Sequence, residues 1–280
     1  MLSKISVANV AFHNVTMEEA VTCIVQMAQK TGRPRYVCTG NLDHLVTLEH
    51  DAEFRAIYDN SDLNLADGKP VVLLSQLSGG EPLCQRVTGS DLFWELARAS
   101  AVTGLRLFFL GGAECAADEA KAAVLRRYPS AVICGTYCPP KELFATDAEQ
   151  QRIREAVQAS DADILLVGFG APKQEKWIAA NKDRLSVPVS IGVGGSFEMA
   201  SGLVRRAPVW MQEAGLEWAY RFLQEPTRLW QRYFVRDLPF FLTLVWRVLA
   251  ERRAEKRTRD RMEPSAEAVL AQPVLTGTES

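Results

Sequence analysis

The sequence lacks the patterns that mark metal sites and disulfide frameworks. Its six cysteines form no CxxC pair and show no zinc-ligand spacing. His13, His44 and His50 make no recognisable ligand set. Asp161-Ala-Asp163 has the spacing of a metal-binding carboxylate pair, but it precedes its predicted strand and therefore falls at the wrong edge of a sheet. We expect a site that uses no metal and no cofactor.

The sequence also lacks the features of exported, membrane-spanning and nucleic-acid-binding chains. Met1–Val10 contains no apolar core of the length that a signal peptide needs. Most cysteines stand in apolar stretches, as expected in a reducing cytoplasm. The longest apolar run, Leu238–Ala250, has 13 residues including Arg247, fewer than the roughly 20 that cross a bilayer. A net charge of −2 argues against nucleic-acid binding.

Charge and composition change toward the C-terminus. Residues 1–220 have a charge balance of −5, residues 221–261 have +6 and residues 262–280 have −3. Tryptophans and arginines become dense from about Arg205. We predict an α/β catalytic domain over residues 1–204 and a helical, arginine- and aromatic-rich appendage over 205–261. Residues 262–280 are polar and are predicted to form a disordered tail.

Short β-type runs alternate with helical patterns along the first domain. The predicted strands are Arg35–Thr39, Asp62–Ala66, Leu105–Leu110, Ala131–Gly135, Ala162–Gly168 and Val187–Gly192. The predicted helices are Thr16–Lys30, Ser90–Val102, Glu114–Tyr128, Asp147–Ala159 and Pro172–Leu185. Thr16 and Glu19 have the spacing of a capping box. This alternation predicts a Rossmann-like parallel sheet with helices on both faces.

Glycine or a small polar residue follows several of the predicted strands. In parallel sheets, ligands bind at the carboxyl edge, and glycine lets a ligand approach the backbone closely. Each turn has an alternative interpretation as an ordinary tight turn, but their gathering on one edge indicates a binding site. The candidate ligand contacts in these turns are Gly68, Gly111, Gly168, Gly170 and Gly194.

A carboxylate stands at the end of the second predicted strand, in Ala66-Asp67-Gly68. A carboxylate in this position can act as a general base for an attacking hydroxyl group. The alternative is that Asp67 forms an Asx turn or caps a helix over Lys69–Leu77. Chemistry alone leaves these two interpretations evenly balanced.

The segment Val167–Glu175 places a glycine-rich turn before a helix that begins near Pro172. A helix N-terminus offers free N–H groups and the positive end of a dipole, which suit a diphosphate. Lys173 adds a charge, and Gln174 can hydrogen-bond to a base or a sugar. The segment is neither a GxGxxG turn nor a P-loop, which weakens both a dinucleotide fingerprint and an NTPase.

Two further residues follow the last predicted strand. Glu198, after Gly194-Gly195-Ser-Phe, is a candidate nucleoside ligand, and Arg206 is a candidate phosphate ligand. Surface salt bridging is the alternative for a paired arginine.

The appendage carries three arginines, Arg221, Arg228 and Arg232, that are seven and four residues apart. This spacing places them near one face of a continuous helix, although Pro226 is expected to break that helix. They are candidates for holding a leaving diphosphate or anionic lipid headgroups. A solvated basic face is the alternative.

Taken in order, these motifs resemble the WecG/TagA/CpsF glycosyltransferases, glycosyltransferase family 26. The resemblance spans about residues 35–233 and rests on TGN at 39–41, ADG at 66–68, RVTGSD at 86–91, VGFGAPKQE at 167–175, GVGGSF at 192–197, RAP at 206–208 and EWAYR at 217–221. Position 198 departs from the family, which commonly has Asp there.

The resemblance implies an inverting, metal-independent transfer of a sugar from a UDP-sugar to a polyprenyl-diphosphate-linked sugar. Such enzymes build teichoic-acid linkage units, enterobacterial common antigen, or capsular and exopolysaccharide repeats. The resemblance puts the catalytic base at Asp67. It assigns supporting polar roles to Thr39, Asn41, Arg86 and Gln174. It implies that the arginine-rich appendage closes over the active site at the membrane. The donor stays open between N-acetylmannosamine-type, glucose-type and uronic sugars.

The expected partners are the UDP-sugar, the lipid-linked acceptor and an anionic membrane surface under the basic helix near residues 238–261. The expected location is the cytoplasmic side of the plasma membrane, and a homo-oligomer stays open. Two other functions are considered. An NAD(P)-binding oxidoreductase needs a GxGxxG turn with an acidic residue about 20 residues further on, and a non-catalytic membrane-associated scaffold needs only the C-terminal segment.

Overall fold

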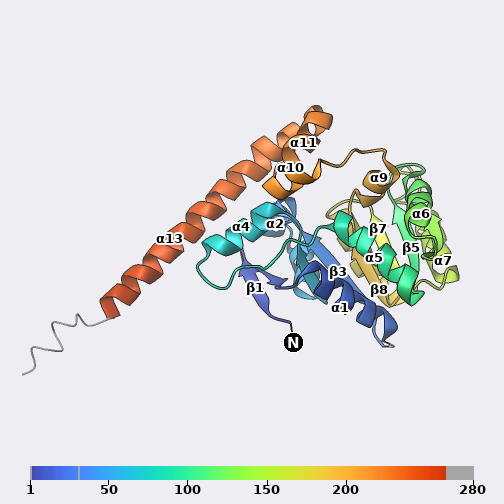
Figure 1. Cartoon of the computed structure of the whole chain (residues 1–280), viewed down its shortest axis with the longest axis horizontal. Helices are drawn as coiled ribbons and strands as arrows, with labels where there is room; N and C mark the ends of the chain where they lie inside the picture. Colours follow the sequence, from blue (N-terminus) through green and yellow to red (C-terminus); the bar gives the residue numbers. More distant parts are fainter. Residues whose placement is uncertain (1, 31, 263–280) are drawn as a thin grey trace, which may run out of the picture.

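Six parallel strands form the central sheet of the computed structural model, which describes residues 2–30 and 32–262 (Figure 1). In sheet order they are β4 (Leu63–Ala66), β3 (Arg35–Gly40), β8 (Val189–Gly192), β7 (Ile164–Gly168), β5 (Arg106–Gly111) and β6 (Val132–Tyr137). Every neighbouring pair is parallel. The predicted α/β fold class and all six predicted strands are confirmed.

Helices cover both faces of this sheet, as the alternation predicted. One face packs against α1 (Met17–Gln29), α5 (Gly89–Thr103), α6 (Ala116–Arg127) and the short α9 (Ser196–Ser201). The other packs against α2 (Leu42–His50), α3 (Ala52–Asp59), α4 (Lys69–Leu77), α7 (Asp147–Ala159) and α8 (Lys173–Leu185). The strands are apolar on both sides because both sides are buried.

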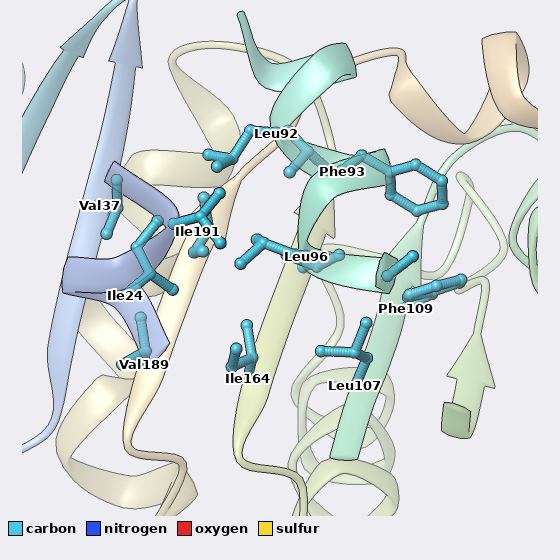
Figure 2. Packing of buried hydrophobic residues seen from close by; sticks show 14 of the residues in the cluster. Ile24, Val37, Leu92, Phe93, Leu96, Leu107, Phe109, Ile164, Val189 and Ile191 are labelled. Carbon is cyan, nitrogen blue, oxygen red and sulfur yellow. The ribbon is translucent and has the colours of Figure 1, made fainter. Parts of the chain in front are cut away.

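Alternate residues of each strand enter opposite cores. Val37 of β3 lies in the first core, under α1 and α5, whereas its neighbour Cys38 lies in the second core, on the opposite face of the sheet. Figure 2 shows Leu92, Phe93 and Leu96 of α5 packed over the strands of the first core. The ring of Phe93 lies 5.2 Å from that of Phe109. This packing fixes α5, and with it the turn that precedes α5, against the sheet.

The chain begins with a hairpin that the sequence did not predict. β1 (Lys4–Val7) and β2 (Val10–His13) pair antiparallel in a separate two-stranded sheet. After it, α1 opens with the predicted capping box, in which Thr16 Oγ1 accepts from the Glu19 N–H and Glu19 Oε2 accepts from the Thr16 N–H.

The appendage consists of α10 (Val209–Ala214), α11 (Glu217–Gln224), α12 (Pro226–Trp230), the π-helix η1 (Gln231–Asp237) and α13 (Leu238–Met262). The predicted break at Pro226 is confirmed, since α11 ends before it and α12 begins with it. α13 runs past α4 and projects beyond the sheet (Figure 1). Within residues 2–30 and 32–262, no helix combines the length and apolarity that crossing a bilayer requires.

α13 is attached to the catalytic domain along its first half. Leu244 is buried, and Phe240, Phe241 and Val245 pack against the second core. Arg247 donates to Glu49 Oε1 of α2 at 3.2 Å. The predicted domain boundaries at 204 and 261 stay predictions, and the predicted tail from residue 263 onward lies outside the described residues.

Candidate active site

A cavity of about 1000 Å³ lies at the carboxyl edge of the sheet, under the appendage. Its floor comes from the loops after β3, β4, β5, β7 and β8, and its cover comes from α11, η1 and the start of α13. The carboxyl edge is where parallel sheets bind ligands. The strand-end turns therefore form one site.

Most of the predicted site residues line this one cavity. They are Thr39, Asn41, Asp67, Gly68, Arg86, Gly168, Gly170, Lys173, Gln174, Gly194, Glu198, Arg221 and Arg232. They come from strand-end loops and from the appendage, which are far apart in sequence. Gly111 and Arg206 do not line it, and the side chain of Arg228 lies outside the described residues.

Gly111 has a packing role in place of the predicted ligand contact. Its φ is +98°, and a Cβ there would lie 2.7 Å from the ring of Phe169. A side chain at this position would therefore be strained and would collide with that ring. The next residue, Gly112, reaches the cavity wall.

Asp67 faces the cavity from the end of β4. Its Oδ2 accepts the backbone N–H of Gly89 at 3.2 Å. The pKa of Asp67 is raised to about 6, chiefly by burial. The charges of Glu217 and Asp91 also raise this pKa, whereas the Gly89 N–H and the charge of Arg86 lower it. The alternative role as a helix cap is excluded, because Gly68 is the N-cap of α4 and no side chain caps that helix.

The pKa of Asp67 predicts the acid limb of the pH profile. A general base must be ionised, so kcat/KM should fall about tenfold per pH unit below pH 6 and level off above it. Glu175 is a second candidate for this limb, since burial raises its pKa to about 7. Glu175 does not line the cavity. A pH profile of the Glu175→Gln variant should keep the limb near 6, and loss of the limb there would assign it to Glu175.

Thr39 and Asn41 hold the rim next to Asp67. The Thr39 hydroxyl donates to the Gly192 carbonyl at 2.9 Å and so ties β3 to β8. Asn41 is the N-cap of α2, where its Oδ1 accepts the His44 N–H at 3.2 Å. No described residue accepts from the Asn41 amide nitrogen, so this donor is available to a ligand.

Gln174 joins two of the glycine turns. Its Oε1 accepts the N–H groups of Gly170 at 3.2 Å and Gly194 at 3.0 Å, and its Nε2 donates to Glu175 Oε1 at 2.7 Å. The sequence predicted a ligand contact and did not predict this bridge. The remaining N–H of the amide is the one polar group that Gln174 can offer to a ligand.

Glu198 offers one free acceptor to the cavity. Its Oε1 accepts the Ala113 N–H at 2.8 Å, and its Oε2 is buried with no hydrogen-bond partner in the described part of the chain. Across the cavity wall, Lys173 Nζ lies 3.3 Å from the centroid of the Phe144 ring. Phe144 and Lys141 belong to a loop before α7 that the sequence did not identify as part of the site.

The arginines differ in how fully they are paired. Arg232 of η1 pairs with Asp43 of α2 at 2.9 Å, and this pair fastens η1 to α2. Arg232 also pairs with Asp237, within η1, at 3.6 Å. Arg221 lines the cavity, and its Nε is buried and has no hydrogen-bond partner among the residues that the structure describes. A buried cationic donor without a partner is a strong candidate for a contact to an anionic ligand.

Arg206 is part of a salt-bridge network, so the alternative that the sequence left open is the observed one. It donates through Nη2 to Asp91 Oδ2 at 2.9 Å and lies 3.4 Å from Glu217 Oε1 through Nε. Glu217 also pairs with Arg86 at 3.5 Å. The sequence motif contained Glu217 but gave it no role, because its partner Arg86 lies in a distant part of the sequence.

Within the described ranges, no three His, Cys, Asp or Glu side chains gather in a way that could hold a metal ion. The fold and the cavity are those of a Rossmann-like protein with a buried carboxylate, Asp67, and several cationic side chains around one cavity. The model of the Glycosyl transferase WecG/TagA/CpsF family matches residues 5–255, and the chain belongs to this family. It is a glycosyltransferase, which excludes the oxidoreductase and the non-catalytic scaffold.

Two curated relatives carry the same enzymatic name. A protein of Bacillus spizizenii (strain ATCC 23059 / NRRL B-14472 / W23) is 32% identical over 210 residues, which are 75% of this chain and 78% of the relative. A protein of Staphylococcus aureus (strain MW2) is 26% identical over 241 residues, 86% of this chain and 91% of the relative. Each is an N-acetylglucosaminyldiphosphoundecaprenol N-acetyl-beta-D-mannosaminyltransferase.

Proposed function

We propose that this protein transfers a sugar from a UDP-sugar to a polyprenyl-diphosphate-linked sugar in cell-surface polysaccharide synthesis, with inversion and without a metal. An N-acetylmannosamine-type donor is the first candidate, since the relatives are named for that transfer. Glucose-type and uronic donors are the other candidates. The observation that carries the proposal is the placement of Asp67, with its raised pKa, in the same cavity as Arg86 and Arg221.

Asp67 acts as the general base in this proposal. Its carboxylate takes the proton from the acceptor hydroxyl, and the oxygen attacks the anomeric carbon from the face opposite the diphosphate. The new glycosidic bond forms as the bond from the anomeric carbon to the diphosphate oxygen breaks. One displacement inverts the configuration at that carbon. UDP leaves with the bonding electrons and the negative charge.

Cationic side chains stabilise the charge on the departing diphosphate. Arg86 and Arg221 line the cavity and carry fixed charges, and Arg221 has a free buried donor. Lys173 and the turn before α8 bind the diphosphate in the ground state, at the N-terminal end of that helix. Glu198 Oε2 is the acceptor for a hydroxyl or N–H group of the nucleoside.

The appendage provides the contact with the membrane in this proposal. Leu238, Leu242 and Trp246 of α13 are 44%, 59% and 70% exposed. They are four residues apart and so form one apolar stripe on the side of the helix away from buried Leu244. Arg252 and Arg253 follow them and are exposed. An apolar stripe next to arginines suits a helix that lies on an anionic lipid surface.

A transfer assay tests this proposal. The donors are UDP-N-acetylmannosamine, UDP-glucose and a UDP-hexuronic acid, and the acceptor is synthetic N-acetylglucosaminyl-diphosphopolyprenol, free or in vesicles with and without anionic lipid. We expect transfer from one UDP-sugar that survives EDTA, an inverted anomeric centre by NMR, and faster transfer in anionic vesicles. GDP-mannose serves as the control donor. Activity that EDTA abolishes, or a retained anomeric configuration, would overturn the proposed mechanism.

A further inference from the structure

A chain of charged side chains connects the appendage to the turn beside Asp67. Glu217, the first residue of α11, lies between two arginines: its Oε2 is 3.5 Å from Arg86 Nη1 and its Oε1 is 3.4 Å from Arg206 Nε. Arg206 in turn donates hydrogen bonds from both of its terminal nitrogens to the carboxylate of Asp91. The network therefore runs from Asp91 through Arg206 and Glu217 to Arg86.

Both ends of this network, Arg86 and Asp91, lie in residues 86–91, and this segment also donates a hydrogen bond to Asp67. Asp91 is fixed by Thr88, whose Oγ1 donates to Asp91 Oδ2 at 2.7 Å and accepts the Asp91 N–H at 3.1 Å. Gly89, between them in sequence, donates its N–H to Asp67. Residues 86–91 thus hold the base through one backbone group and present Arg86 to the cavity.

We propose that Glu217 is a positioning residue for sugar transfer, one that holds the Arg86 guanidinium beside Asp67 when the appendage is docked. This inference rests on the proposed function, because it assigns Arg86 to the departing diphosphate. Glu217 acts through Arg86 and needs no contact with the substrate.

The surroundings of Glu217 support this role. Its side chain is only 21% exposed, and a carboxylate flanked by two guanidinium groups separates charges that would otherwise repel each other. Asp91 holds the Arg206 guanidinium in place, so the position of Arg206 does not depend on that of Arg86. Glu217 is therefore held on one side, and it can fix Arg86 on the other.

The same carboxylate acts on Asp67 through its charge. The charged and titratable groups that influence Asp67 or are influenced by it are Arg86, Asp91, Glu217 and Tyr58. Burial, Glu217 and Asp91 raise the pKa of Asp67, and Arg86 lowers it. Removing the charge of Glu217 should therefore lower that pKa and move the acid limb of the pH profile to lower pH.

A double-mutant cycle on the full-length enzyme tests the inference. The variants are Glu217→Gln, Arg86→Lys and both together, assayed with the UDP-sugar that the wild type uses. Glu217→Gln should lower kcat by about tenfold, with a smaller change in KM for the donor, since Arg86 acts on charge that develops during transfer. In the Arg86→Lys background the same change should have little further effect. The acid limb should move to lower pH in Glu217→Gln.

Glu213→Gln is the matched control, because Glu213 is an exposed carboxylate of α10 that does not line the cavity. It removes the same charge from the appendage and should keep the wild-type kcat. Glu217→Asp, which restores the charge, tests the role if Glu217→Gln fails to fold, and it should recover the wild-type acid limb. Additive losses in the cycle, or a loss in Glu217→Gln that appears only in KM for the donor, would overturn the inference. A wild type that transfers no sugar would overturn the proposed function itself.

Discussion

Replacement of Asp67 by Asn is expected to lower kcat by at least about 10²-fold while UDP binding stays close to that of the wild type. The substitution keeps the shape of the side chain, and its amide oxygen can still accept the Gly89 N–H that now binds Oδ2. It removes the basic oxygen that would take the proton from the acceptor. Steady-state rates with the lipid-linked acceptor and calorimetric titration with UDP measure the two effects separately.

The stability of this variant provides its control. The pKa of Asp67 is raised in the folded protein, so folding favours the protonated carboxyl and the ionised form opposes folding at pH 7. At pH 7 the free energy of unfolding of the Asn variant should therefore equal or exceed that of the wild type. An inactive variant that is also less stable would point to a structural fault, and near-normal turnover would remove Asp67 from the role of base.

The strands of the sheet could be predicted from the sequence because each of them carries its own local signal. Apolar runs such as Ile164–Val167 are buried on both sides, and a glycine marks where such a strand ends. The hairpin lacked such a signal. Its turn uses Ala8 and Asn9, both with positive φ, where hairpin turns usually show a glycine. Asn tolerates this conformation, but Ala rarely adopts it, and Asn9 is followed by Val10 and not by glycine, so the usual turn signal is missing.

The helices α2 and α3 were missed for a related reason. Asp51 ends α2, and its carboxylate accepts the Phe54 N–H at 2.9 Å to begin α3. One residue thus separates two short helices, with no proline or glycine between them. The pattern over residues 41–59 is helical only once both caps are recognised.

The candidate site was predicted where chemistry is local and missed where it depends on long-range pairing. Asp67 and the glycine turns are recognised because each stands at the end of a strand. Asp91, one of the two partners of Arg206, is 115 residues away, so nothing near Arg206 in the sequence indicates this ion pair. The bridge that Gln174 makes between Gly170 and Gly194 likewise exists only once β7 and β8 are neighbours.

Replacement of Arg221 by Ala is expected to lower kcat/KM by about 10²–10³-fold, the range for removing one donor that stabilises charge in the transition state. Arg221 lies on α11 in the wall of the cavity, and its buried Nε has no hydrogen-bond partner in the described structure. The residue is half-buried and makes no ion pair with the other described residues, so the thermal midpoint of the variant should stay close to that of the wild type.

The controls for Arg221 separate charge from geometry. Arg221→Lys keeps the charge but loses the planar donor fork, and it should recover only part of the activity if the guanidinium binds two oxygens of the diphosphate. Arg205→Ala removes an exposed arginine that does not line the cavity and should retain wild-type kcat/KM. If Arg221→Ala lowers the thermal midpoint as well as kcat/KM, this arginine holds the appendage in place and does not stabilise the leaving group. The opposite result, lost activity with retained stability, would mean that α11 keeps a cation unpaired in the free enzyme for the charge that forms on UDP.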